Sequence, residues 1–247
     1  MRQFKRLHLT AEGHSEGKFV RDILSNHLGN FNISADARRV LTKKDKFKTY
    51  RGGIVRFEKF KKDITNWLLE DNNVDVRFST MIDLYGLPKD FPGQAEASKV
   101  HDPYEKVKIL ESKFEEEIND RRFIPYIQLH EFEALVFSKP DMIKYEYYGR
   151  ETEVSKLTGM LNEKGNNPEL INDSSLTAPS KRIEFLIPEY DKVNSGVLIL
   201  KAIGIDHIRN LCKHFNDWLI KLEKIYVELP IKSHTRWQAT HSVHILS

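Results

Sequence analysis

Five acidic side chains stand at the ends of strand-like stretches, although they lie far apart along the chain. An alternating segment over residues 4–11, an apolar run over 74–82 and a further apolar segment over 123–129 each run into carboxylates. These carboxylates are Glu12, Glu16, Asp83, Glu131 and Glu133. Because the carboxyl ends of parallel strands lie along one edge of a sheet, where α/β proteins gather their ligands, we expect the five side chains to meet in one crevice.

Carboxylates gathered in a crevice raise one another's pKa unless a cation lies among them. Mg²⁺ prefers oxygen ligands, and two such ions activate a nucleophile and stabilise the leaving oxygen in phosphodiester cleavage. The acids therefore predict a Mg²⁺ site that would also accept Mn²⁺. The alternative interpretation is that they are solvated residues of loops that begin helices. Glu131 and Glu133 point the same way only if the chain is still extended there, because strand side chains alternate with period two.

Positive charge is concentrated at the N-terminal end, although the chain of 247 residues has a formal net charge of only +3. Residues 1–62 contain 16 Lys and Arg against 6 Asp and Glu. The densest basic segment holds Lys43, Lys44, Lys46, Lys48 and Arg51. Together with the intervening Phe47 and Tyr50, it predicts a nucleic-acid-binding arm that holds phosphates by charge and stacks an unpaired base. A solvated loop anchored by its two aromatic rings is the alternative.

The elements that must position these residues alternate between strand and helix. Apolar spacing predicts a strand over about 33–41, helices over about 56–70 and 103–121, and mainly helix beyond about residue 140. This order predicts an α/β fold, with a mostly parallel, Rossmann-like sheet flanked by helices and a helical C-terminal subdomain. The expected divisions are an α/β catalytic core over 1–140, a helical subdomain that completes the site over 141–228, and a loosely held tail over 229–247.

The composition describes a globular chain and favours the cytoplasm. Hydrophobic residues make up 40% of the sequence, enough for a substantial core. The best apolar run, over 196–205, is interrupted by Lys201 and falls short of the ~20 residues that a membrane-spanning helix needs. No secretory signal pattern precedes the first strand. The single cysteine, Cys212, fits a reducing compartment and a buried thiol.

The residues around the first two acidic positions resemble a Toprim domain. That pattern has a glutamate after its first strand, usually followed by glycine, and an Asp-x-Asp at a later strand end. Glu12 with Gly13, and Asp83, occupy those places here. More closely, the chain resembles a bacterial Toprim-like family described as a domain of unknown function and related to the OLD-type nucleases. The stretches that carry this likeness are 80–88, 128–135, 179–182 and 192–219.

This resemblance implies a Mg²⁺-dependent nuclease, and it leaves open whether the substrate is DNA or RNA. Glu12 is expected to bind metal or assist proton transfer, and Asp83 is expected to be the principal metal ligand. The remaining metal ligands implied by the likeness are Glu16, Glu131 and Glu133. Similarity to the OLD-type nucleases also implies a late lysine that steadies charge on the scissile phosphate, and Lys192 is the candidate.

One position departs from the Toprim pattern. Tyr85 stands where the second aspartate of Asp-x-Asp would be, and its phenol, with an ordinary pKa of ~10, is a poor Mg²⁺ ligand. Glu131 and Glu133 could supply the missing carboxylates, as acidic pairs do in OLD-type nucleases. A site with two metals, with one metal, and with none therefore all stay open.

The resemblance further implies a protein partner. The sequence has no Gly-x-x-x-x-Gly-Lys-Ser/Thr loop for a nucleotide, so any ATP-driven control must come from another chain. Related proteins are often encoded beside an ATPase, of the AAA or ABC type, in anti-phage defence pairs in which the Toprim subunit is the toxic effector. A homo-oligomer is also compatible with the sequence. Two other functions stay open: a catalytically silent module that binds nucleic acid or the ATPase, and phosphoryl chemistry on a small nucleotide.

Histidines give weaker signals. His14 and His130 neighbour the acids and could orient a carboxylate or meet phosphate, although a structural hydrogen bond is the alternative for His130. His241 and His244 could hold a transition metal if that segment were helical. Because no cysteine or second histidine pair accompanies them, they are better interpreted as ordinary residues of the tail.

Overall fold

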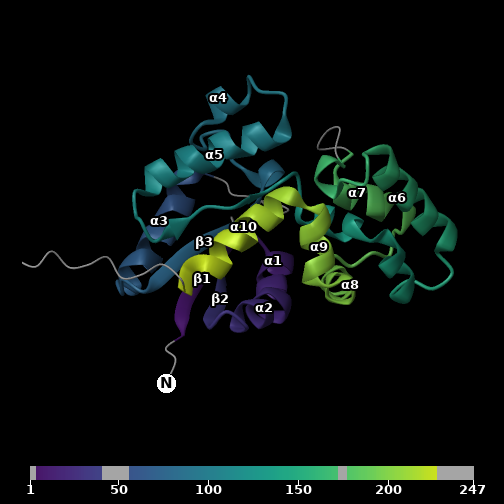
Figure 1. Ribbon diagram of the computed structural model, residues 1–247. Coiled ribbons are helices and arrows are strands. Elements are labelled where there is room, and N and C mark those ends of the chain that lie inside the picture. Colours follow the sequence, from purple (N-terminus) through teal and green to yellow (C-terminus); the bar gives the residue numbers. More distant parts are fainter. Residues whose placement is uncertain (1–3, 41–55, 172–176, 227–247) are drawn as a thin grey trace, which may run out of the picture.

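A parallel sheet forms the centre of the molecule. The computed structural model describes residues 4–40, 56–171 and 177–226. Within these residues the strand order is β2-β1-β3-β4, with β5 also pairing with β3, and every pair is parallel. The strands are β1 (Lys5–Ala11), β2 (Ile33–Arg39), β3 (Val76–Asp83), β4 (Phe123–Ile124) and β5 (Ile127–Gln128). The expected α/β fold with a mostly parallel sheet is confirmed (Figure 1).

Helices cover both faces of this sheet, which explains why the central strand β3 is buried along most of its length. Side chains alternate along β1 and β3, so that Leu7 and Met81 enter one buried cluster and Val76 and Phe78 enter the other. The first face carries α1 (His14–Phe19), the π-helical turn η1 (Val20–Leu24) and α2 (Ser25–Gly29). The second face carries α3 (Phe57–Glu70), α4 (Gln94–Ala97) and α5 (Pro103–Ile118).

The predicted strands and helices of the sheet region, up to residue 121, agree with the structure apart from their ends. Helix α5 begins at Pro103, whose preceding Asp102 side chain accepts a hydrogen bond from the Glu105 amide at 2.9 Å. It ends at Ile118, earlier than expected, because Asn119 adopts a left-handed conformation with φ of 50°. The single strand expected over 123–129 is wrong: it is broken into β4 and β5, and Pro125, which has no amide hydrogen to donate, lies between them.

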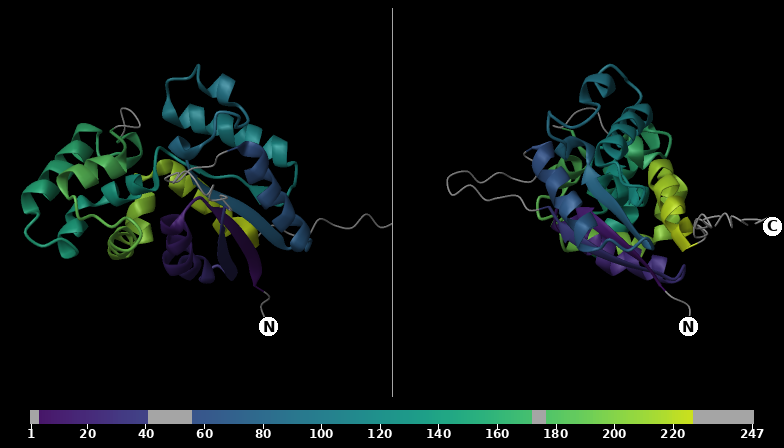
Figure 2. Two further views of the ribbon diagram at one scale, coloured as in Figure 1. Left: turned by 180° about the vertical axis from the view of Figure 1, so that it is seen from behind. Right: turned by 90° about the vertical axis from the view of Figure 1, so that its left-hand side faces the viewer.

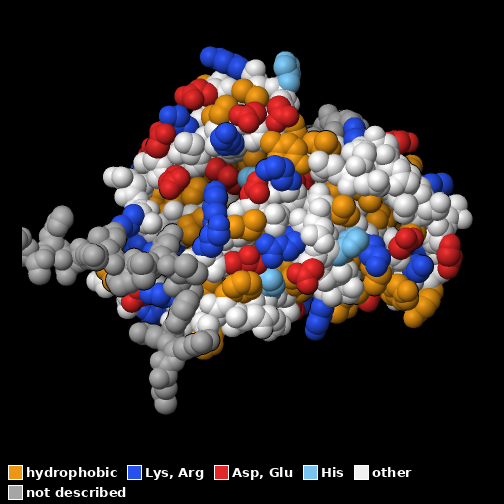
Figure 3. Space-filling view, in the orientation of Figure 1, with side chains coloured by type: hydrophobic (Ala, Val, Ile, Leu, Met, Phe, Trp, Pro, Cys, Tyr) orange, Lys and Arg blue, Asp and Glu red, His pale blue; other side chains and the backbone are white. Residues whose placement is uncertain are grey.

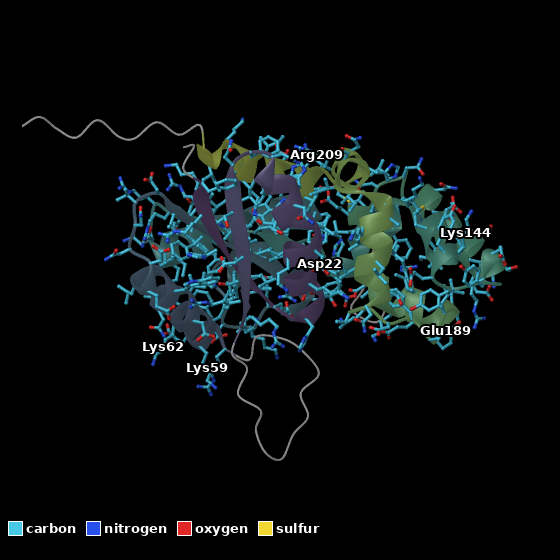
Figure 4. All side chains as sticks on the ribbon, turned by 90° about the horizontal axis from the view of Figure 1, so that it is seen from below. Asp22, Lys59, Lys62, Lys144, Glu189 and Arg209 are labelled. Carbon is cyan, nitrogen blue, oxygen red and sulfur yellow. The ribbon has the colours of Figure 1, made fainter. Side chains whose placement is uncertain are left out.

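Beyond β5 the described chain contains no further strand, as the sequence predicts, and forms a helical half. It comprises the 3₁₀ turns η3 (Phe132–Ser138), η4 (Pro140–Tyr145), η5 (Pro168–Leu170) and η6 (Lys224–Tyr226), and the helices α6 (Glu151–Glu163), α7 (Pro179–Leu186), α8 (Ser195–Ile203), α9 (Ile205–Leu211) and α10 (Lys213–Glu223). Most of these lie to one side of the sheet (Figure 2). Seen from below, Lys59 and Lys62 lie at one end of the molecule, and Lys144 and Glu189 at the other (Figure 4).

The last helix, α10, returns to the sheet and packs on the face that carries α1 and α2. The Trp218 indole donates a hydrogen bond to Ser79 Oγ at 2.9 Å and stacks on Tyr126 with ring centroids 4.2 Å apart. One buried hydrophobic cluster runs from β1 through to α10 and includes Cys212, the buried thiol. The domain boundary near residue 140 stays a prediction, since this cluster spans both sides of it.

A buried carboxylate fixes the start of α10. Glu169, with no exposed surface, accepts hydrogen bonds from the amides of His214 at 2.9 Å and Phe215 at 3.0 Å. These amides belong to the first turn of α10, where a helix leaves its N–H groups without partners. The Tyr104 hydroxyl of α5 donates to the same carboxylate at 3.0 Å. Glu169 therefore ties the helical half to helices on both faces of the sheet.

Several sequence predictions fall on residues outside the described ranges. They include the basic arm with Lys43, Lys44, Lys46, Lys48 and Arg51, the tail over 229–247, and His241 and His244.

Charged side chains of both signs are interspersed over the face shown in Figure 3. No helix in the described ranges is both long and apolar enough to span a membrane.

Candidate functional site

The ends of β1 and β3 bring the first two acidic positions into direct contact. Ala11 is the register partner of Met81, so the residues that follow each strand lie side by side. The Glu12 amide donates to the Met81 carbonyl at 3.0 Å, and the Asp83 amide donates to Glu12 Oε2 at 2.9 Å. Two residues separated by 71 positions in the sequence therefore meet at the carboxyl edge of the sheet, as the strand pattern predicts.

Glu16 and Glu131 lie near the same edge of the sheet, and the carboxylate of each contacts the N-terminus of a helix. Glu16 is buried in the first turn of α1, where its carboxylate accepts hydrogen bonds from its own amide and from that of Gly13. Glu131 Oε2 accepts a hydrogen bond from the Ser180 amide, in the first turn of α7, at 3.1 Å. Both carboxylates thus use the partial positive charge of a helix start.

Glu133 and Lys192 complete the cluster. Glu133 is only 1% exposed, and its Oε1 lies 3.8 Å from Lys192 Nζ. Lys192 sits in the loop before α8, where Asp191 Oδ1 accepts hydrogen bonds from the amides of Val193 at 2.9 Å and Asn194 at 3.0 Å. The Ser15 hydroxyl of α1 also donates to the Lys192 carbonyl at 3.4 Å. We call Glu12, Glu16, Asp83, Glu131, Glu133 and Lys192 the carboxylate cluster.

The electrostatics of the carboxylate cluster reflect its burial. Desolvation, opposed in part by Lys192, raises the pKa of Glu133 to about 7. Desolvation also raises the pKa of Glu12 to about 7, and raises the pKa of Asp83 well above its ordinary value, with the neighbouring carboxylates adding to both effects. The facing carboxylates, Glu133 foremost, raise the pKa of Lys192 in turn. Burial and like charge act together here, as they do at sites that hold protons or cations.

Two carboxylate oxygens of the cluster are buried without a hydrogen-bond partner: Asp83 Oδ1 and Glu133 Oε1. Buried acceptors of this kind are rare in folded proteins and are a common mark of a ligand or ion site. Oxygen-only donors of negative charge fit Mg²⁺ or Mn²⁺. Across the described ranges, however, no three or more His, Cys, Asp or Glu side chains are already arranged as a metal-ligand set. The side chains would therefore have to rotate inward to share an ion.

The condition under which Glu131 and Glu133 would point the same way, an extended chain through both residues, is not met. The chain is extended at Glu131 but turns into η3 directly after it, so that Glu133 lies in a 3₁₀ turn. The 3₁₀ turn instead buries Glu133 beside Lys192, while Glu131 reaches the start of α7.

Tyr85 takes no part in the carboxylate cluster. Its ring lies 5.6 Å from the ring of His130, and its amide donates to the His130 carbonyl at 3.3 Å. His130 has a φ of 65°, a left-handed conformation that is strained for a residue with a side chain. Burial and the charge of Lys106 lower the pKa of His130 to about 4, against a hydrogen bond to the backbone of Glu169. The structural hydrogen bond considered for His130 in the sequence analysis does not account for Nδ1, which is buried without a partner.

Two glycines that the sequence analysis did not interpret structurally define the space around the cluster. A Cβ on Gly86 would collide with the Glu12 carboxylate, so this glycine lets the turn after β3 close over Glu12. A Cβ on Gly196 would lie 2.6 Å from the Tyr190 hydroxyl, which is buried without a hydrogen-bond partner. Gly86 stands within the stretch 80–88 that carries the family likeness, and that position was the only signal available in the sequence.

Comparisons with known proteins place the chain in a family. The profile of a family described as a domain of unknown function (DUF4276) matches residues 11–223. The chain belongs to this family. The match begins at the end of β1 and ends at the end of α10, so that it includes the whole carboxylate cluster. No curated protein matches the sequence.

Among solved structures, the chain is similar to the C-terminal regions of two OLD proteins. That of the Burkholderia pseudomallei OLD protein is 14% identical with a TM-score of 0.45, over 90% of this chain and 99% of the other. That of the Xanthomonas campestris pv. campestris OLD protein is 15% identical with a TM-score of 0.37, over 88% of this chain and 95% of the other.

Proposed function

We propose that this DUF4276 member is a Toprim-type, Mg²⁺-dependent nuclease that hydrolyses phosphodiester bonds of DNA or RNA. One observation carries the proposal: Asp83 Oδ1 and Glu133 Oε1 are buried acceptors without a hydrogen-bond partner, among carboxylates whose pKa values are raised, and Lys192 Nζ, 3.8 Å from Glu133 Oε1, is the one cation of the cluster. Such an arrangement is costly unless something positive binds there. The sequence resemblance to Toprim domains supplies the reaction class.

Each residue has a definite task in this proposal. Glu12, with a pKa of about 7, can accept or release a proton at neutral pH, and its Oε2 is held by the Asp83 amide. Asp83 and Glu133 would hold Mg²⁺ through their unpartnered oxygens, with Glu16 and Glu131 beside them. Lys192, half-exposed and facing the cluster, would contact the scissile phosphate. Bound Mg²⁺ would polarise the phosphate and a water molecule.

Whether a second Mg²⁺ ion can bind depends on which further carboxylates can serve as its ligands. Tyr85 cannot replace the second aspartate of Asp-x-Asp, because its ring packs beside His130. A second ion would therefore depend on Glu131 and Glu133, which enter from η3 and the residue before it. We propose that these two residues take the place of the missing aspartate.

The proposal includes partners and a setting that derive from the sequence and its resemblance. Substrate would be held by the basic arm that contains Lys43, Lys44, Lys46, Lys48 and Arg51. An ATPase of the AAA or ABC type would regulate cleavage in the cytoplasm, with this chain as the toxic effector of an anti-phage defence pair.

The test compares wild type with Asp83→Asn, which keeps the shape of the side chain and removes its charge. Purified protein is incubated with single- and double-stranded DNA and RNA in Mg²⁺, Mn²⁺ or EDTA, and Mn²⁺ binding is measured separately by calorimetry. We expect cleavage with either metal but not in EDTA, and loss of both cleavage and Mn²⁺ binding in Asp83→Asn. Glu163→Gln, an exposed carboxylate at the end of α6, is the matched control and should keep both.

Mn²⁺ binding also separates the nuclease from the silent module. A wild-type protein that binds nucleic acid but takes up no Mn²⁺ would be the silent module, and the nuclease assignment would be wrong. Cleavage that persists unchanged in Asp83→Asn would equally remove the assignment, because it would come from another site or another protein.

A further inference from the structure

A second concave site lies beside the carboxylate cluster. It is a pocket of about 380 Å³, within the range of small-molecule sites, lined by residues from the start of α5, from the end of α6 and from η5. Its walls include Leu84, Tyr85, Pro103, Lys106, His130 and Leu170. The pocket therefore combines apolar surfaces and an aromatic ring with a cation.

The pocket and the carboxylate cluster share a wall. Leu84 and Tyr85 follow Asp83 directly, and His130 precedes Glu131. The hydrogen bond from the Tyr85 amide to the His130 carbonyl, at 3.3 Å, joins the two segments. The same two chain segments therefore line the pocket and carry Asp83 and Glu131 of the cluster.

His130 forms part of the pocket wall. The residue is 5% exposed, and its Nδ1 is buried without a hydrogen-bond partner. Its ring lies 5.6 Å from the ring of Tyr85, so that the two rings border the same pocket.

Positive charge at the rim points to an anionic ligand. Lys106, Lys164 and His101 all line the pocket. Lys106 is half-buried in the first turns of α5 and forms no ion pair with any carboxylate of the described ranges. Burial and the charge of Lys106 both lower the pKa of His130, which lines the same pocket.

We propose that this pocket binds one unpaired nucleotide, with its base against the apolar wall of Leu84, Tyr85 and Pro103 and its phosphate at Lys106. Next to the proposed nuclease centre, on which this inference rests, the bound nucleotide is the one adjoining the cleaved phosphodiester. The substrate is therefore single-stranded or locally unpaired, since a base that packs against these side chains has left its base pair and its stack.

The test measures binding in EDTA, so that it does not depend on metal or on cleavage. A fluorescent single-stranded oligonucleotide is titrated by anisotropy at several salt concentrations, with a duplex of the same sequence, a mononucleotide and inorganic phosphate as competitors. Lys106→Gln is compared with Lys108→Gln, an exposed lysine of the same helix whose side chain is 78% exposed. Lys106→Arg serves as the conservative variant, and melting curves confirm that all three fold.

We expect Lys106→Gln to weaken single-strand binding about tenfold and to lower the slope of log K against log salt by about 0.7, the value for one phosphate contact in a single strand. Lys108→Gln and Lys106→Arg should stay within about twofold of wild type. The single strand and the mononucleotide should compete at this site, and the duplex and inorganic phosphate should compete poorly. Equal behaviour of Lys106→Gln and Lys108→Gln, or competition by phosphate as strong as by the nucleotide, would overturn the inference.

The outcomes separate this inference from the proposed nuclease. If only the mononucleotide binds in a Lys106-dependent way, the pocket takes a free nucleotide, and the role at a cleaved strand is wrong. If single strands need Lys106 but no metal supports cleavage, the pocket stands and the nuclease does not. If Asp83→Asn abolishes cleavage while Lys106→Gln binds normally, the nuclease stands and the pocket does not.

Discussion

Replacing the most deeply buried carboxylate of the cluster by its neutral isostere should stabilise the protein at alkaline pH. Glu133 is 1% exposed, and burial raises its pKa from 4.5 to about 7. The folded state therefore binds more protons than the unfolded state between these two values. Stability must consequently fall as the pH rises through that window. Glu133→Gln removes the ionisation and should remove the fall.

The magnitude follows from the two pKa values. Each tenfold difference in proton affinity is worth 1.36 kcal/mol, so ionising Glu133 inside the fold costs ~3 kcal/mol once the pH exceeds 7. Part of that cost is already present at pH 5, where the unfolded side chain is mostly ionised. The stability of Glu133→Gln relative to wild type should therefore rise by about 2.5 kcal/mol between pH 5 and pH 8. For a chain of this size that is a relative gain of ~5–10 °C in melting temperature.

The assay is urea and thermal unfolding of both proteins in EDTA at pH 5, 6, 7 and 8. Glu163→Gln, at an exposed side chain, controls for the substitution itself. Adding Mn²⁺ at pH 8 should raise the stability of wild type more than that of Glu133→Gln, because a cation favours the ionised carboxylate. Each ligand bound only by the folded state adds RT ln(1 + [L]/Kd).

Two results would refute this reasoning. A difference between Glu133→Gln and wild type that is the same at pH 5 and pH 8 would mean that Glu133 does not titrate in this window. A variant that is less stable than wild type at pH 8 would mean that the contact with Lys192 outweighs the cost of burying the charge.

Three further predictions test other parts of the structure. Gly86→Ala should displace the Glu12 carboxylate, which would lower metal-dependent cleavage ~10²-fold in single-turnover kinetics. The free energy of unfolding in urea should fall by about 1–3 kcal/mol. Unaltered kinetics would contradict the close approach of Gly86 to Glu12. Glu169→Gln should cost about 2–3 kcal/mol in urea unfolding because one amide of α10 loses its acceptor, whereas a neutral result would mean that water replaces it. Burial lowers the pKa of His214, but the hydrogen bond to Glu111 and nearby carboxylates outweigh it, so the ring should titrate above 6.5 by NMR. The stability from that contact is present below pH 6.5 and is lost as the pH rises through the folded pKa; a wild-type titration matching that of Glu111→Gln would disprove the coupling.

Much of the sheet could be predicted because the segment over 4–11 alternates, the segment over 74–82 is mostly apolar, and turn-forming residues follow both. The run that ends at Asp83 is buried on both faces, so its composition alone distinguishes it from an amphipathic helix. The meeting of Glu12 and Asp83 follows from parallel pairing, which aligns strand ends regardless of their distance in sequence. These inferences need only local patterns and one topological rule.

The remaining parts depend on contacts that no local pattern encodes. The place of Glu133 depends on a 3₁₀ turn that begins directly after Glu131, and its burial beside Lys192 depends on where α8 packs. The role of Gly86 becomes visible only when the Glu12 carboxylate is placed against it. The pocket beside His130 likewise needs α5, α6 and η5 in their positions in space, and nothing in the spacing of its residues predicts it.

The hydrogen bond from Ser15 to the Lys192 carbonyl joins residues 177 positions apart. During translation, the ribosome must therefore release nearly two hundred residues before Lys192 can reach Glu12, which follows β1, and Glu16 of α1, and α10 must follow before the sheet is covered. Closing so long a loop costs conformational entropy before the contact can form. A nascent polypeptide that ends before Lys192 would therefore lack the assembled carboxylate cluster.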